Sequence, residues 1–297
     1  MMQAGKYSFI GAALLAALVQ TAAFPAGLDT LKKVADSAKN AESSISKASS
    51  SIAAIAEDIT PEQQYYIGRA VAGTVLKSYK LYDNKAATAY VNKICAVITQ
   101  ASDMPLLYKG YYVGILDTDE VNALSSPGGH ILVTRGLLEC AQDEDALAAV
   151  LAHEIAHIQL GHSVKAIKSN RATNELIKTV ESEIPHGGNA RILADLGVNI
   201  DDMVEEMVTS GYSKTQEFQA DKKALSLMSD AGYDPAAMQD MLNLLKLKEA
   251  GQTSGFCKNH PDAESRIKNI KSELKKYKQE YNRNVRLARF GKTQEKL

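Results

Sequence analysis

Apolar residues near the N-terminus recur at alternating steps of three and four, the heptad pattern of a helix that packs along one seam. The pattern runs from Leu31 to Ile59, with Asp29 or Thr30 before it as the candidate N-cap. Many of the apolar positions are alanines, so the helix has little stability of its own. We expect residues 24–59 to form a helical arm that packs on the rest of the chain, pairs with another copy, or lies on a membrane surface.

Two stretches after this arm also carry apolar residues at helical spacing. The first begins with Thr60 as N-cap and Pro61 at the first helical position, and Gln63 can complete a capping box. The second covers residues 86–100. The residues expected to face the core from the second helix are Tyr90, Val91, Ile94 and Ile98.

Two later stretches favour β-structure. Residues 111–116 and 131–134 are rich in β-branched and aromatic side chains, and the turn sequence Pro127-Gly128-Gly129 lies between them. We expect these strands to form a hairpin in a small sheet. The fold class is therefore α+β and mainly α-helical.

The strongest chemical signal is the pattern H-E-x-x-H, in an apolar helical run that ends at His157. His153 and His157 are one helical turn apart, so their rings can converge on one cation. Zn²⁺ prefers imidazole nitrogen, and a catalytic zinc site leaves one position open for water, which Glu154 can reach as a general base. The alternative is histidines buried for packing, but burying these polar groups among apolar neighbours is costly unless something pairs them. We therefore expect one zinc ion per chain.

The third ligand is expected on a separate helix. Ser213 to Gln216 have the sequence of a capping box, and the helix that follows carries Glu217 and, one turn later, Asp221. Glu217 can complete a His, His, Glu ligand set, and Asp221 can accept a hydrogen bond from a ligand imidazole. In isolation such a pair is an ordinary solvated face, so the prediction depends on the upstream histidines. His162 lies about 140° around the helix from His157 and is not expected to bind the metal.

The segments after the metal helix are expected to cover it and to close the chain. The helix should break at Gly161, and residues 163–211 are predicted to be a helical insertion or lid. Residues 261–297 are predicted to form one long basic helix. Its lysines and arginines are expected to be solvated, with contact to anionic lipid headgroups as the alternative.

Residues 1–23 have the pattern of a secretory signal peptide. Lys6 precedes an apolar stretch, and small residues lie before Phe24. The apolar stretch is short for a membrane span, although a retained signal anchor is the alternative. We expect a periplasmic or secreted protein, with possible peripheral membrane contact or self-association through the arm.

Composition narrows the class of protein. The chain has 297 residues, 45% of them hydrophobic and 23% charged, with a formal net charge of −1. Such values fit one large globular domain over residues 60–297 and argue against a nucleic-acid binder. Three cysteines, Cys95, Cys140 and Cys257, are too few for a disulfide framework, and we expect free thiols.

Taken together, the motifs resemble those of periplasmic zinc metallopeptidases of the HtpX, Oma and BepA type, relatives of the CAAX prenyl endoprotease. The resemblance extends from about Thr60 to Ile270. The matching segments are Ile67-Gly68-Arg69, Leu81-Tyr82-Asp83, Asp119 to Asn122, Pro127 to Gly136, His153 to His157, Tyr212 to Asp221, Asn259-His260-Pro261 and Arg266-Ile267.

The resemblance implies a zincin-like metallopeptidase domain with a small β-sheet beside the H-E-x-x-H helix. The roles it implies are zinc ligation by His153, His157 and Glu217, general base catalysis by Glu154, and support of the ligands by Asp221. It also implies that His260 approaches the metal, either to stabilise the oxyanion or to occupy the open zinc position. Arg266 would anchor acidic groups of the site.

A sheet edge beside such a site has a specific use, because an extended substrate can add to it as a further strand. The candidate substrate-binding residues are Asn122, Ala123, Gly128 and Gly129, and the glycines would permit close backbone approach. We expect an endopeptidase for unfolded or misassembled cell-envelope proteins. The alternative is an envelope chaperone or assembly factor with a latent protease site.

Overall fold

The computed structural model describes residues 58–167, 204, 211–249, 260, 263–277 and 281–294. The chain divides into two units, Met1–Ala56 and Glu57–Leu297, and the fold described here is that of the second. The predicted signal peptide, nearly all of the predicted arm, most of the predicted lid and Cys257 lie outside the described residues. Predictions about them remain predictions.

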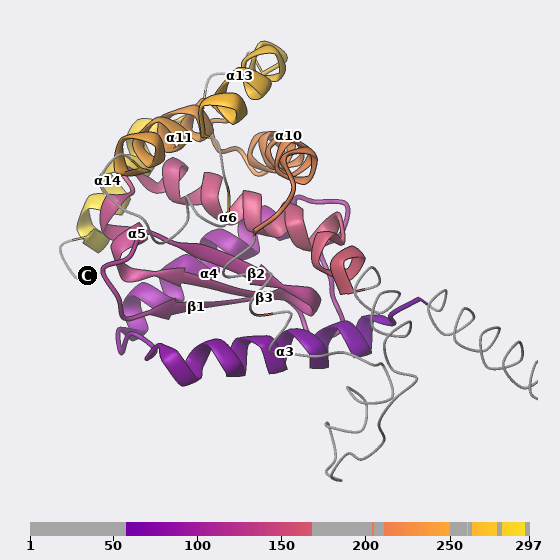
Figure 1. Ribbon diagram of the computed structural model, residues 1–297. Helices are drawn as coiled ribbons and strands as arrows, with labels where there is room; N and C mark the ends of the chain where they lie inside the picture. Colours follow the sequence, from indigo (N-terminus) through magenta and orange to yellow (C-terminus); the bar gives the residue numbers. More distant parts are fainter. Residues whose placement is uncertain are drawn as a thin grey trace, which may run out of the picture. The chain divides into compact units, whose positions relative to one another are not determined.

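A small sheet lies at the centre of the second unit (Figure 1). Its strands are β1 (Tyr112–Leu116), β2 (Ala123–Ser126) and β3 (His130–Thr134), in the order β1-β3-β2. β2 and β3 are antiparallel and joined by the short helix η1 (Pro127–Gly129), whereas β1 and β3 are parallel. The predicted hairpin of the first and last strands is therefore wrong, because β2 was not recognised as a strand.

Alternation along the strands sends side chains to opposite faces of the sheet. Leu124 and Leu132 cluster with Val75 of helix α3 (Pro61–Ser78) on one face. Ile131 and Val133 join the main core on the other face. That core includes residues of α4 (Lys85–Gln100) and α6 (Glu144–Gln159), so helices cover both sides of the sheet.

Both early helices begin where the sequence predicts. The Thr60 side chain accepts a hydrogen bond from the Gln63 backbone N–H, and the Gln63 side chain accepts one from the Thr60 N–H. These two bonds satisfy backbone donors that have no partner inside the helix. In α4, Val91, Ile94 and Ile98 are buried as expected, and Tyr90 is half-buried.

Helix α6 is buried along most of its length and packs against the helices of the C-terminal part. Those in contact with α6 are α10 (Lys214–Asp230), α11 (Ala236–Glu249) and α14 (Arg283–Gln294), whereas α13 (Ala263–Leu274) packs on α10 and α11. The short α5 (Arg135–Cys140) connects β3 to α6. Asp143 is the N-cap of α6, and its side chain accepts a hydrogen bond from the Ala146 N–H. None of the described helices is long and apolar enough to cross a membrane.

The C-terminal part corrects one prediction and supports others. Residues 261–297 are not one helix, since α13 ends at Leu274 and α14 begins at Arg283. The arginines of α14 are not simply solvated, because three of them form ion pairs with acidic residues at the start of α6. The mainly helical fold with a small sheet is confirmed, and Cys95 and Cys140 are free thiols.

Candidate metal centre

Helix α6 brings the two motif histidines together inside the protein. The Nε2 atoms of His153 and His157 are 3.0 Å apart, and both side chains are buried. Their rings meet edge to face with centroids separated by 4.6 Å. Spacing of one helical turn therefore produces the convergence that the sequence predicts.

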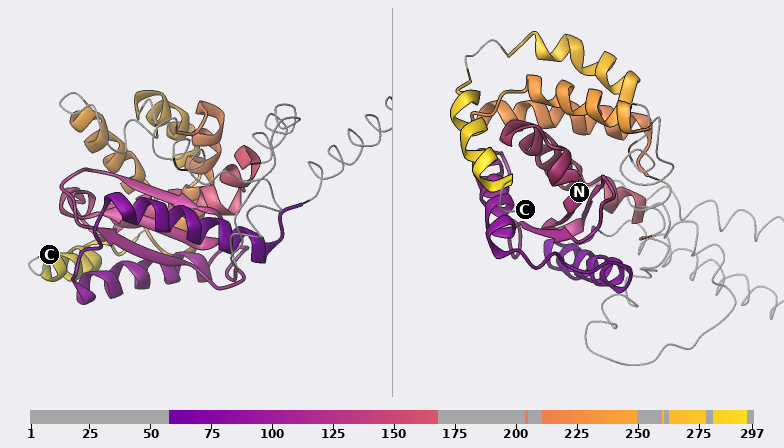
Figure 2. Two further views of the ribbon diagram at one scale, coloured as in Figure 1. Left: turned by 60° about the horizontal axis from the view of Figure 1, so that its bottom comes forward. Right: turned by 90° about the vertical axis from the view of Figure 1, so that its left-hand side faces the viewer.

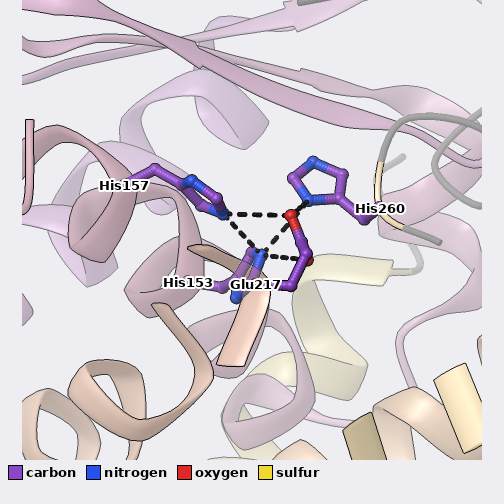
Figure 3. A group of neighbouring side chains, drawn as sticks. All are labelled: His153, His157, Glu217 and His260. Atoms are coloured by element: carbon purple, nitrogen blue, oxygen red, sulfur yellow. Dashed lines mark hydrogen bonds and ion pairs between the residues drawn. The ribbon is translucent and has the colours of Figure 1, made fainter. Parts of the chain in front are cut away.

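Glu217 of helix α10 and the downstream residue His260 complete the cluster (Figure 3). The capping box at Ser213 starts α10, which places the buried Glu217 opposite α6. The Glu217 carboxylate lies 3.4 Å from Nε2 of His153 and 3.5 Å from Nε2 of His157. Nδ1 of His260 is 2.9 Å from Oε1 of Glu217, and one donor atom from each of the four residues falls within 4.8 Å of the others. Such a group of nitrogen and oxygen donors can hold a metal ion.

Asp221 of α10 and Arg266 of α13 support this cluster. Oδ1 of Asp221 lies 3.0 Å from Nδ1 of His153, one turn along α10 from Glu217. Arg266 makes hydrogen bonds of 2.9 and 2.6 Å to both oxygens of Asp221 and an ion pair of 3.1 Å to Glu217. Burial by itself raises the pKa of Asp221, but the charge of Arg266 and hydrogen bonds from His153 and Arg266 lower it to about 2. Asp221 is therefore a carboxylate at neutral pH and accepts a hydrogen bond from His153.

A second support holds His157, and the sequence analysis missed it. Nδ1 of His162 lies 3.0 Å from Nδ1 of His157, and Nε2 of His162 lies 3.3 Å from Oε1 of Gln219. The ring of Tyr212 stacks on His157 with centroids 3.9 Å apart. His162 is outside the donor cluster, as its rotation around the helix predicts. The signal that could have revealed its role is a histidine just after the helix break at Gly161, where the chain can turn back toward His157.

Glu154 is the most unusual group at the site. It is fully buried, and neither carboxylate oxygen has a hydrogen-bond partner among the described residues. Nε2 of His260 lies 3.6 Å from Oε1 of Glu154. Because a buried carboxylate without partners is costly, its position beside the donor cluster indicates chemistry that needs it there.

The predicted substrate-binding residues divide into two pairs. β2 is an edge strand among the described residues; Ala123 in it faces the core, and Asn122 just before it is buried with an unpaired Oδ1. Gly128 and Gly129 instead pack against the protein itself. A Cβ atom would lie 2.4 Å from Cα of Tyr65 at Gly128 and 2.3 Å from the carbonyl oxygen of Gly110 at Gly129. The close approach that the glycines permit is therefore made by α3 and the loop before β1, and the role of these two as substrate contacts stays a prediction.

Comparisons with known proteins agree with this geometry. Residues 85–274 match the model of peptidase family M48. Mitochondrial metalloendopeptidase OMA1 of Schizosaccharomyces pombe is 30% identical over 190 residues, which are 63% of this chain and 53% of that protein. Metalloprotease LoiP of Escherichia coli is 28% identical over 170 residues, 57% of this chain and 63% of that protein.

A further relative is much longer than the matched region. The β-barrel assembly-enhancing protease of Escherichia coli is 23% identical over 202 residues, which are 64% of this chain and 39% of that protein. In each of these three relatives, the match covers less than two thirds of the relative's own length.

Proposed function

Because the chain belongs to peptidase family M48, we propose that it is a zinc-dependent endopeptidase whose general base is Glu154. The observation that carries the proposal is the buried carboxylate of Glu154, which has no hydrogen-bond partner among the described residues and lies beside four converging donor groups. A purely structural metal site would need no such group, because it fills its coordination positions with ligands and activates no water.

The donor atoms have the chemical types and the mutual distances that zinc sites use. Atoms about 2.0–2.1 Å from a zinc ion at the corners of a tetrahedron lie about 3.4 Å apart. Five separations among the imidazole nitrogens and the Glu217 carboxylate run from 2.9 to 3.5 Å, and all four donor groups lie within 4.8 Å of one another. Imidazole and carboxylate are also the ligands of many catalytic zinc sites. We assign His153, His157 and Glu217 as the zinc ligands.

The reaction follows from what the neighbouring side chains can do. A bound zinc ion supplies a Lewis acid that polarises the scissile carbonyl and makes water more acidic. Glu154 takes a proton from the attacking water as the oxygen–carbon bond forms, and it returns that proton to the leaving amine as the carbon–nitrogen bond breaks. His260 can donate a hydrogen bond to the oxyanion once its ring is released from Glu217. Asp221 accepts a hydrogen bond from Nδ1 of His153, which directs Nε2 toward the metal site and makes that nitrogen a more basic ligand.

We further propose that the substrates are unfolded or misassembled proteins of the cell envelope. An extended chain can add to β2, which is an edge strand among the described residues, through main-chain hydrogen bonds that do not select side chains. One relative is a β-barrel assembly-enhancing protease, and its name supports an envelope role, as does the signal-like sequence of residues 1–23. The location is accordingly periplasmic or secreted, and the predicted arm is a candidate for membrane contact or self-association.

The test compares wild-type protein with Glu154→Gln on an unfolded casein-like substrate. We expect one zinc per chain in both, chelator-sensitive cleavage by the wild type, and at least a hundredfold slower cleavage by the variant, because the base is lost while the ligands remain. Glu264→Gln is the matched control, since Glu264 is an exposed residue of α13. Full activity of a clean Glu154→Gln preparation would contradict the assignment.

One observation favours a second candidate function, an assembly factor whose protease site is latent. Nδ1 of His260 stands where a fourth ligand would be, 2.9 Å from Glu217 and 3.3 Å from His153. A fourth protein ligand would leave no position for water. If this function is correct, wild type will suppress aggregation of unfolded envelope proteins without cleaving them, and Glu154→Gln will do so equally well. Cleavage that appears in His260→Ala would identify His260 as the group that closes the site.

A further inference from the structure

A groove of about 680 Å³ lies between α4 and α14 and shares no residue with the metal centre. The two helices run beside each other in the right-hand view of Figure 2, and the rings of Tyr90 and Phe290 connect them at 6.3 Å. Glu144, at the start of α6, and Tyr233 also line the groove. Its volume is in the range of small-molecule sites, roughly 300–1,000 Å³. We call it the α4–α14 groove.

One wall of the groove is an apolar face of α4. Tyr90, Ile94 and Val97 lie at positions i, i+4 and i+7 and therefore share one side of the helix. Val97 is 47% exposed, whereas Ile94, one turn earlier on the same side of the helix, is buried. An apolar surface that remains open to water in this way can bind an apolar group.

Glu144, the acidic residue in the groove, does not repel anions strongly, because Arg289 compensates its charge. Glu144 is 1% exposed and accepts hydrogen bonds from Arg289 at 2.6 Å, Tyr90 at 2.5 Å and Tyr233 at 3.1 Å. Burial and the neighbouring Glu144 raise the pKa of Tyr90, so the phenol stays protonated and continues to donate. The local charge is therefore set by the remaining basic residues.

Two of these basic residues are available at the rim. Lys93 of α4 and Lys292 of α14 are exposed, line the groove and form no ion pair with any described residue. Lys93 lies next to Ile94 on the apolar face, and Lys292 lies one turn after Arg289. The groove thus combines an apolar wall with uncompensated positive charge at its opening.

We propose that the α4–α14 groove binds a single-chain anionic amphiphile. The carboxylate or phosphate head lies between Lys93 and Lys292, and the hydrocarbon chain lies along Tyr90, Ile94 and Val97. Apolar burial supplies affinity along the chain, and the two ammonium groups select an anion over a neutral head. A fatty acid and a lysophospholipid offer the same chemistry, so the experiment includes both kinds of head group.

The first experiment measures displacement of a fluorescent fatty acid, 11-(dansylamino)undecanoic acid, from the full chain below micellar concentrations. We expect one saturable site, displacement by dodecanoate or dodecyl phosphate, and affinity that rises by about two- to fourfold per methylene from eight to twelve carbons. Stronger displacement by dodecanoate than by dodecyl phosphate would identify the fatty acid as the ligand, and the reverse would identify the phosphate-headed lipid.

Dodecanol, which has the same chain and a neutral head group, should displace the probe at least tenfold more weakly than dodecanoate. Absence of saturable binding, equal displacement by dodecanol, or full displacement by millimolar inorganic phosphate would overturn the proposal.

The second experiment locates the site with charge-matched variants. Lys93→Glu combined with Lys292→Glu should weaken dodecanoate binding at least tenfold. The control is Lys271→Glu combined with Lys275→Glu, which makes the same charge change at exposed residues outside the groove. Ala96→Trp, which fills the groove from an exposed position, should abolish binding while the thermal midpoint stays within about 3 °C of wild type. Equal weakening in both double variants, or unchanged binding in a folded Ala96→Trp protein, would contradict the assignment.

Discussion

At the scale of single residues, two different partners orient the two ligand histidines. His153 donates to a charged acceptor, Asp221, whereas His157 faces the neutral His162. Burial lowers the pKa of His162 to about 4, so this ring is neutral at pH 7 and has one proton to donate. Nε2 of His162 faces the side-chain oxygen of Gln219 and donates its proton to it. Nδ1 of His162 therefore has no proton and accepts a hydrogen bond from Nδ1 of His157. His157 then carries its proton on Nδ1 and presents the lone pair of Nε2 to the metal.

This arrangement predicts that Gln219 controls zinc affinity from outside the ligand set. In Gln219→Ala the acceptor for His162 is lost, the proton can move to the other nitrogen of His162, and His157 no longer has a fixed tautomer. We expect zinc affinity to fall by about 10- to 100-fold, measured by competition with a fluorescent chelator. Gln219→Glu is the matched variant, because it keeps the acceptor and should bind zinc at least as tightly as wild type. Equal affinity of wild type and Gln219→Ala would show that the contact does not orient His157.

At the scale of whole elements, helix α14 holds the start of the metal helix. Arg283, Arg286 and Arg289 recur every three residues and so lie along one side of the helix. Their ion-pair partners are the consecutive acids Asp143, Asp145 and Glu144, respectively. Acids at a helix N-terminus are favoured by the helix dipole, but burying them requires compensating charge. The arginines supply that charge.

The most buried of these pairs should contribute most to stability. Arg286 binds both oxygens of Asp145, at 2.7 and 2.8 Å, and the Asp145 side chain is completely buried. Among the described residues, Arg286→Ala leaves that carboxylate with the Asp234 N–H as its one hydrogen-bond donor, and we expect the free energy of unfolding in urea to fall by about 2–3 kcal/mol. Val285→Ala, at a position 59% exposed, should change it by less than about 0.5 kcal/mol. An unchanged free energy in Arg286→Ala would mean that the pair adds no net stability.

Elements were predictable where local chemistry determined them. The capping boxes at Thr60 and Ser213 fix the starts of α3 and α10, because they satisfy backbone donors within four residues. β2 could not be predicted in this way, since Ala-Leu-Ser-Ser lacks β-branched residues and is a strand only through pairing with β3. The ion pairs of α14 were also missed, because a charge run shows no partner in the sequence.

At the scale of the whole molecule, the metal centre joins parts of the fold that are distant in the sequence. His153 and Glu217 come from different helices, and His260 reaches the cluster from a third part of the chain. Spacing along α6 predicted the histidine pair, but only the resemblance to known metallopeptidases indicated His260. A lone histidine before a proline carries no spacing signal. His260 lies just before α13, and its proximity to Glu217 depends on the packing of α13 against α10 and α11.

Because the ligands come from separate segments, metal binding should stabilise the entire domain and not α6 alone. Free zinc at 1,000 times its Kd contributes about 4 kcal/mol to the folded state, and each kcal/mol shifts the thermal midpoint of a domain of this size by about 2–4 °C. We expect a chelator to lower the midpoint by about 8–16 °C in scanning calorimetry, and one equivalent of zinc to restore it. His157→Ala should start from the lower midpoint and show no response to chelator. If wild type melts at the same temperature with and without chelator, the buried cluster of His153, Glu217 and Arg266 holds these segments together without the metal.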